Sequence, residues 1–392
     1  MALSGTNQGQ ARPHNRRTVL EAIRQHGPIS RADIARRVGL TTQTVSTITS
    51  ELLDHGFLSL RPGARKGRGF PAPCFEIAPE GAFAIGVSIS PRGLEAGLMD
   101  LAGNLVSGRR VAASRLSAKQ AFGAIRELVD DLASGHAEER ILGVGISLPG
   151  PFGIEAMSFV GSTTMEGWSE ADIREGLHDT LPYPTFVDGD MSAAAHGERL
   201  FGRGTEFRDF FYLYMGVGLG GAMIYNNQVM RGAHGNASEI GHIPIVLNGE
   251  PCSCGNRGCL ERYFSLEAYD RRVPEIGEAA WLDEIRPIFC AAIVTIENMY
   301  EPETIVLGGQ APDGLLARLL ALADDLPVSL GARSDRKVPR IVPSLAGSDA
   351  VIRGAASLAV NRVFAPGETP PDRSGRDAAP DLFSSRMERE TR

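Results

Sequence analysis

The chain has 392 residues, with 43% hydrophobic and 22% charged residues, a composition typical of globular proteins. Its length favours two or three domains. No run of eighteen apolar residues and no signal-like segment occurs, which argues against a membrane span or secretion and predicts a cytoplasmic protein. The net charge of −7 is unevenly distributed: residues 1–80 carry eleven basic against six acidic residues, and the remainder carries 29 against 41. We call residues 1–80 the head and the remainder the body. The basic charge of the head indicates that it alone binds a polyanion. A charged surface that contacts only solvent is the alternative.

Capping signals in the head predict three short helices. Gly27-Pro28 ends the first helix, within "NRRTVLEAIRQH". Ser30 is placed to cap "RADIARRV", which Gly39 ends. Thr41 is placed to cap "TQTVSTITSELLDH", whose apolar residues recur on one helical face.

A glycine-rich basic loop follows, flanked by the strand-like segments "FLSL" and "PCFEI". We therefore predict that residues 1–80 form a winged helix-turn-helix that binds double-stranded operator DNA. The candidate DNA contacts are polar residues of the third helix and basic residues of the wing: Thr42, Gln43, Thr44, Ser46, Thr47, Arg61, Arg65, Lys66 and Arg68. One head alone would bind one half-site of an operator with low affinity. We therefore expect a homodimer or homotetramer that binds paired half-sites. A small helical module that binds only protein is the alternative.

The body begins near residue 81 with three strand-like segments, "FAIGVSIS", "LEAGLMDL" and "NLVSGRRVAAS". Alternating helical and apolar segments then predict α/β layers. A strand-strand-glycine pattern occurs twice and hints at a duplicated, two-lobed body. The tail, residues 365–392, is rich in Pro, Gly, Ser and charge and is predicted to be disordered.

Five segments of the body carry a family resemblance: "LPGPFG", "VDGDMSAAAHGE", "GVGLGGAMI", "EIGH" followed by "CSCGNRGCLE", and "IVLGGQ". In this order they resemble the ROK family, named for repressors, open reading frames and kinases, and the attached head resembles its repressor branch. The resemblance implies a two-lobed actin-like (ribonuclease-H-like) sugar kinase fold with a sugar site in the cleft. We expect the first lobe at 81–190, joined by a C-terminal helix near 348–364, and the second lobe at 191–347.

Three of the five cysteines lie within eight positions, after a Glu-x-Gly-His. His242, Cys252, Cys254 and Cys259 offer one imidazole and three thiolates, a sufficient tetrahedral set for a structural Zn²⁺. Gly255 and Gly258 are expected to allow the tight turns that bring the thiolates together. A reduced, metal-free loop is the alternative.

The resemblance implies that Glu239, His242 and Glu261 contact sugar hydroxyls, and that Asp190 stands where the family places its catalytic base. If His242 gives one ring nitrogen to zinc, the other can donate to a hydroxyl. Glu239 and Glu261 alternatively support the zinc loop. Asp190 alternatively caps a helix or accepts a sugar hydroxyl without chemistry.

Phosphate-binding positions differ from the family pattern. We call the two loops that hold phosphate in the family the first and the second cradle. The first cradle has the pattern Asp-x-Gly-Gly-Thr in the family. It aligns with residues 88–92, "SISPR", which lack the aspartate and both glycines. The second cradle, residues 216–221, keeps its glycines, although a plain glycine hairpin is an equal reading. Gly189 and Thr164 replace two asparagines usual in the family. We therefore expect Asp190 to be vestigial and kinase activity to be lost.

The sequence thus predicts a transcriptional regulator, a repressor of sugar uptake or catabolism genes, gated by a sugar or sugar phosphate. Two alternatives remain open. One is a bifunctional sugar kinase with a DNA-binding head, and the other is a constitutive repressor controlled by a partner protein.

Overall fold

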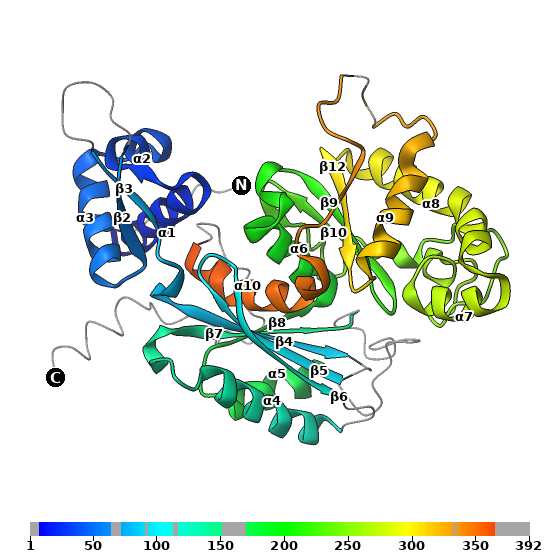
Figure 1. Cartoon of the computed structure of the whole chain (residues 1–392), viewed down its shortest axis with the longest axis horizontal. Coiled ribbons are helices and arrows are strands. Elements are labelled where there is room, and N and C mark those ends of the chain that lie inside the picture. Colours follow the sequence, from blue (N-terminus) through cyan, green and yellow to red (C-terminus); the bar gives the residue numbers. More distant parts are fainter. Residues whose placement is uncertain are drawn as a thin grey trace.

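The computed structural model describes residues 8–63, 72–90, 93–112, 117–150, 170–331, 333 and 335–364. Several predicted positions lie outside these residues: Arg65, Lys66, Arg68, Pro91, Arg92, Thr164 and the tail, 365–392. Figure 1 shows three parts, a small head and two larger α/β lobes. No helix of the described residues is long and apolar enough to span a bilayer.

The head contains three helices and a three-stranded sheet, and the predicted helix caps are confirmed. Ser30 accepts a hydrogen bond from the Asp33 amide, Thr41 accepts one from the Thr44 amide, and Gly39 ends its helix with φ of 67°. The strand order is β1-β3-β2. The elements are α1 (Gln8–His26), β1 (Ile29–Ser30), α2 (Arg31–Val38), α3 (Thr42–Asp54), β2 (Leu58–Pro62) and β3 (Pro73–Ile77).

The first lobe is built on a five-stranded sheet of order β6-β5-β4-β7-β8. Its strands are β4 (Phe83–Ser90), β5 (Gly93–Asp100), β6 (Leu105–Ala112), β7 (Ile141–Leu148) and β8 (Thr185–Gly189). Helices α4 (Ala118–Ala133) and α5 (Glu170–Thr180) cover one face, and α10 (Ala350–Phe364) covers the other (Figure 1). Because both faces are covered, the central strands β4 and β7 are almost continuously buried.

The second lobe repeats this arrangement with the order β11-β10-β9-β12-β13. Its strands are β9 (Phe210–Met215), β10 (Leu219–Tyr225), β11 (Gln228–Val229), β12 (Thr304–Gly309) and β13 (Ile341–Pro343). Helices α8 (Glu278–Tyr300) and α9 (Asp313–Ala321) pack on one face, α6 (Asp190–Phe201) packs on the other, and α7 (Leu266–Ile276) leads into α8. The same strand order in both lobes agrees with the repeated pattern in the sequence.

Helices α6 and α10 form an inner layer between the two sheets. A Cβ on Gly354 would lie 2.3 Å from the Ala193 carbonyl oxygen, so the glycine permits the close approach of the two helices. Beside them, the buried Glu198 carboxylate accepts hydrogen bonds from the Arg203 amide at 2.8 Å and the Ser344 hydroxyl at 2.7 Å. Glu198 therefore ties together the chain leaving α6 and the chain entering α10.

The head shares one apolar core with the first lobe. Ile23 and Phe57 of the head belong to the same buried cluster as Met99 of β5 and Ala356 and Val360 of α10. Since contiguous apolar packing resists separation, the head and the first-lobe sheet form one packed unit.

Candidate metal and ligand site

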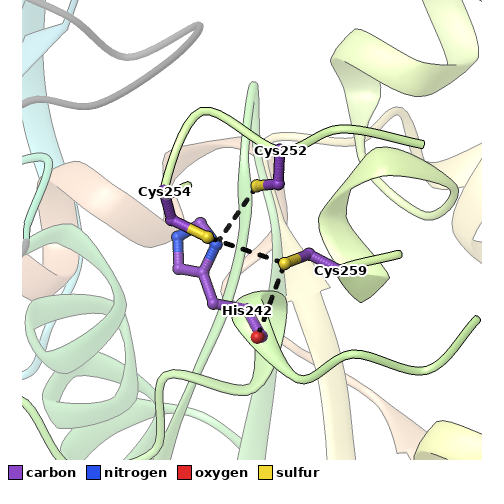
Figure 2. A group of neighbouring side chains, drawn as sticks. All are labelled: His242, Cys252, Cys254 and Cys259. Carbon is purple, nitrogen blue, oxygen red and sulfur yellow. Dashed lines mark hydrogen bonds between the residues drawn. The ribbon is translucent and has the colours of Figure 1, made fainter. Parts of the chain in front are cut away.

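Four side chains predicted to bind metal converge on one point. Figure 2 shows the sulfurs of Cys252, Cys254 and Cys259 gathered around the ring of His242. The Cys252 sulfur lies 3.6 Å from His242 Nδ1, and the sulfurs of Cys254 and Cys259 lie 3.6 Å apart. All four ligand atoms lie within 4.8 Å of one another. We call this set the Cys/His cluster.

The spacing within the Cys/His cluster fits a tetrahedral ion. Zinc bonds of about 2.3 Å to sulfur and about 2.0 Å to nitrogen place two sulfurs about 3.8 Å apart and a sulfur and a nitrogen about 3.5 Å apart. The two pair distances of 3.6 Å are close to these values. Because Nδ1 faces the sulfurs, Nε2 is the His242 nitrogen left for a ligand.

Two glycines shape the loop that carries the thiols. Gly255 has φ of 91° and Gly258 has φ of 74°, which confirms the predicted tight turns. A Cβ on Gly258 would lie 1.7 Å from the Val246 carbonyl oxygen. Short antiparallel bridges, Pro244 with Cys259 and Pro251 with Arg257, hold the turns together.

Burial, with the neighbouring cysteine side chains, raises the pKa of the Cys259 thiol to about 12. At neutral pH this thiol keeps its proton in the metal-free protein. Metal binding must therefore release that proton, and the affinity for metal falls as the pH falls.

Three carboxylates gather beside the Cys/His cluster: Asp190 from the first turn of α6, Glu239 before a short 3₁₀ turn, and Glu261 after Cys259. We call them the carboxylate cluster. Desolvation, together with the negative charge of Glu261, raises the pKa of Asp190 to about 7. The hydrogen bond from the Met191 amide lowers this pKa but does not cancel the increase. Desolvation and the charges of the other two carboxylates raise the pKa of Glu239 to about 7. Such mutual repulsion favours a ligand that donates hydrogen bonds.

The Glu261 carboxylate links this cluster to the glycine-rich turn between β9 and β10. It accepts a hydrogen bond from the Leu219 amide at 2.9 Å. Desolvation raises its pKa, although the Leu219 hydrogen bond and the His242 charge oppose this. Within the turn, the carbonyls of Gly216 and Val217 accept hydrogen bonds from the amides of Leu266 and Glu267. The start of α7 therefore fixes the turn.

The corresponding hairpin of the first lobe is described on either side of its turn, in β4 up to Ser90 and in β5 from Gly93. Ser88 is buried within β4 and pairs with Glu95, and the Ser90 hydroxyl donates to the Gly93 carbonyl. A buried serine cannot supply the charge of the family aspartate to a metal ion.

The structure adds an ion pair that sequence reasoning missed. Arg231, in the loop that leads to Glu239, donates two hydrogen bonds to Asp188, at 3.1 and 2.6 Å. Burial would raise the pKa of Asp188, but the charge and hydrogen bonds of Arg231 hold it below its usual range. The pair joins the strand before Asp190 to the loop before Glu239. Only the sequence closeness of Asp188 to Asp190 hinted at a role.

On the head, the predicted DNA-contacting residues of α3 are unequally placed. Thr42, Gln43 and Thr47 are exposed, whereas Ser46 and Thr44 are half-buried. The Thr44 hydroxyl lies 2.8 Å from that of Thr41, within the cap.

On the wing, Arg61 pairs with Glu76 at 2.6 Å. That exposed pair is weak enough to be exchanged for a phosphate contact. Arg61 therefore remains a predicted phosphate contact.

Two family models match the chain. The ROK family model matches residues 84–362, and a model described as winged helix-turn-helix DNA-binding matches residues 12–59. The chain belongs to the ROK family. The predicted family, the winged helix head and the two-lobed actin-like fold class are thereby confirmed.

Similar proteins include both regulators and enzymes. The xylose repressor of Bacillus spizizenii is 24% identical over 373 residues, 88% of this chain and 94% of that protein. The glucokinase of Streptomyces coelicolor is 33% identical over 195 residues, 50% of this chain and 60% of that protein. A crystal structure of a ROK family transcriptional regulator, a homolog of the E. coli MLC protein, has a TM-score of 0.70 and 23% identity, and covers 91% of this chain and 98% of that chain.

Proposed function

We propose that this ROK protein is a DNA-binding transcriptional repressor whose operator affinity is set by a sugar bound at the carboxylate cluster. The observation that carries the proposal is the packing of a winged helix head into one apolar core with the body that holds this cluster. A head packed in this way can respond directly to a change in the body.

An aldose is the ligand class that the site fits best. Asp190, Glu239 and Glu261 offer acceptors for hydroxyl donors, and His242 Nε2 adds a donor or an acceptor. The similar xylose repressors make D-xylose the first probe. A sugar phosphate is the second choice, because three carboxylates repel a phosphate unless it points away from them.

Zinc is the metal we propose for the Cys/His cluster, on its donor set and spacing. Its role is structural, since all four positions of a tetrahedral ion are filled by protein. Bound there, it fixes the His242 ring and the loop that carries Glu261.

We further propose that the protein is not a kinase. Phosphoryl transfer requires positioned phosphates and Mg²⁺. Ser88 replaces the aspartate at the first cradle, and among the described residues of the two hairpins the β9–β10 turn is the one that keeps the glycine pattern. The similarity to a glucokinase favours the bifunctional alternative, and sugar-dependent ADP release tests it directly. Turnover with D-glucose or D-xylose above that of the Asp190→Ala variant would support the kinase.

The deciding experiment is a gel shift of the purified zinc-loaded protein on DNA from upstream of its own gene. D-Xylose, D-glucose and their phosphates are titrated into the complex. The proposal expects a specific complex that one sugar releases. A specific complex that no sugar alters would contradict the sugar-gated function and favour control by a partner protein. Light scattering of the same sample tests the proposed homodimer or homotetramer.

A further inference from the structure

A polar contact joins the DNA-binding head to helix α6, the helix that begins at Asp190. In the head, the Arg24 guanidinium of α1 donates to the Leu200 carbonyl of α6 at 2.5 Å and also binds Glu21. Glu21 lies 4.0 Å from Arg199 of α6. The Arg199 guanidinium in turn donates to Asn361 of α10 at 2.7 Å. We call these residues the α1–α6 contact.

The charged groups of the α1–α6 contact are withdrawn from water. The side chains of Arg24, Glu21 and Arg199 are 8%, 15% and 7% exposed. Burial would raise the pKa of Glu21, but the hydrogen bonds and charges of Arg24 and the charge of Arg199 leave it lowered. A buried charged network is directional and intolerant of displacement, whereas apolar contacts accept small shifts.

The contact crosses the boundary between the two lobes. The head packs by apolar side chains on the first-lobe sheet and α10, and Phe201 at the end of α6 packs against the same cluster. Helix α6 packs on the second-lobe sheet, where Ala194 and Ala195 meet Phe210 and Tyr212. Movement of the second-lobe sheet therefore acts on α6, the helix that the head contacts at its C-terminal end.

Helix α6 connects the two functional ends. About 15 Å of this helix separates Asp190 in the carboxylate cluster from Leu200 at the head. A ligand that draws the carboxylate cluster together acts on the first turn of this helix, and a packed helix transmits a displacement along its axis.

Building on the proposed function, we propose that Arg199, with Glu21 and Arg24, forms the contact through which ligand binding beside Asp190 reaches the DNA-binding head. Arg199 is a positioning residue: its contacts are with Asn361 of α10 and Glu21 of α1, and it acts by holding α1 against α6.

Hydrogen exchange of α1 tests the coupling without requiring the sugar or the operator to be known. Asp190→Asn removes the charge at the first turn of α6 and retains a hydrogen-bond acceptor. Arg199→Met removes the guanidinium at the other end. Amide exchange of peptides covering residues 14–26 is measured in the full-length, zinc-loaded wild type, both single variants and the double variant.

We expect Asp190→Asn to change the exchange of α1 in the wild type and to have no effect in the Arg199→Met background. Arg140→Met is the matched control, because Arg140 donates to the Glu80 carbonyl near the head but lies outside α6. The response to Asp190→Asn should survive in that background. No response of α1 in the wild type, or an equal response in the Arg199→Met and Arg140→Met backgrounds, would overturn the proposal.

Arg24→Met provides an independent break of the same contact if Arg199→Met melts below the assay temperature, and it should give the same loss of response.

A measurement of DNA affinity then separates this inference from the proposed function. With D-xylose, Arg199→Met should keep sugar affinity within about twofold of the wild type but show at least about a fivefold smaller change in DNA affinity. Failure of every sugar to release DNA from the wild type would refute the proposed function, while the exchange result would still decide the coupling.

Discussion

The two lobes share one strand order, but their equivalent hairpins have different local structures. The β9–β10 turn keeps Gly216 and Gly218, and its backbone is held by α7 and by Glu261. The β4–β5 hairpin instead has Ser88 buried in its first strand and Ser90 bonded to the Gly93 carbonyl. Under the proposed function, the second-lobe hairpin keeps the glycines expected of a phosphate-binding turn, whereas the first-lobe hairpin has serine at the two described positions, 88 and 90, where the family pattern has aspartate and glycine.

This contrast has a physical basis in how each hairpin is supported. The second-lobe turn is fixed by the loop that carries the Cys/His cluster, so a change there disturbs His242 and Glu261 together. Within the described residues, the first-lobe hairpin is held mainly by strand pairing, which serine preserves as well as glycine. Serine at positions 88 and 90 therefore leaves the strand pairing of this hairpin intact.

The largest effect is expected from breaking the Cys/His cluster. Cys254→Ser removes one thiolate, so zinc content should fall and D-xylose affinity should fall at least about tenfold as His242 and Glu261 lose their support. Metal analysis and calorimetry measure both. The control is Cys290→Ser on α8, outside the cluster, which should change neither. Full sugar affinity in zinc-free Cys254→Ser would contradict the structural role of the metal.

A smaller loss is expected from Gly241→Ala. The added Cβ would lie 2.1 Å from the Leu219 carbonyl oxygen, so the 3₁₀ turn carrying His242 must shift. The free energy of unfolding in urea should fall by about 1–3 kcal/mol, with weaker sugar binding. Gly123→Ala is the control, since its Cβ meets no atom within 4 Å in an exposed part of α4, and it should stabilise by about 0.5–1 kcal/mol. Unchanged stability of Gly241→Ala would show that this turn is not tightly held.

The pH dependence of stability tests the carboxylate cluster. The pKa of Asp190 is raised from 3.8 to about 7 beside Glu239, Glu261 and Tyr214. Its stabilising contribution is therefore complete below pH 4 and is lost as the pH rises through 7. Asp190→Asn should gain stability over the wild type as the pH rises from about 4 to about 7, by at most about 4 kcal/mol. Asp131→Asn, at an exposed position, should show no such trend. A constant difference across this range would contradict a buried, repelled Asp190.

The smallest expected effect concerns nucleotide. Mg²⁺ with AMPPNP should leave the melting temperature unchanged. A ligand raises the melting temperature only if the folded protein binds it, and we expect no nucleotide binding. The glucokinase of Streptomyces coelicolor serves as the positive control. A concentration-dependent rise in the melting temperature of this protein would show that the β9–β10 turn alone still holds a nucleotide.

Much of the fold could be predicted from local sequence. Ser30, Gly39 and Thr41 marked the head helices because capping is a local property, and the Cys/His cluster followed from ligand types and spacing. The Asp188–Arg231 pair and the α1–α6 contact could not be predicted. They join residues 43 and 176 positions apart, and nothing in the neighbouring sequence of Arg231 or Arg24 distinguishes them from surface arginines.

The measurement that tests the central claim most directly is fluorescence anisotropy of labelled upstream DNA bound to the zinc-loaded protein, titrated with D-xylose in the presence and absence of MgATP. The account predicts that the sugar alone releases the DNA and that MgATP leaves the release curve unchanged. Release that requires MgATP, or that reverses as the sugar is phosphorylated, would contradict a sensor that has lost its phosphate-binding half.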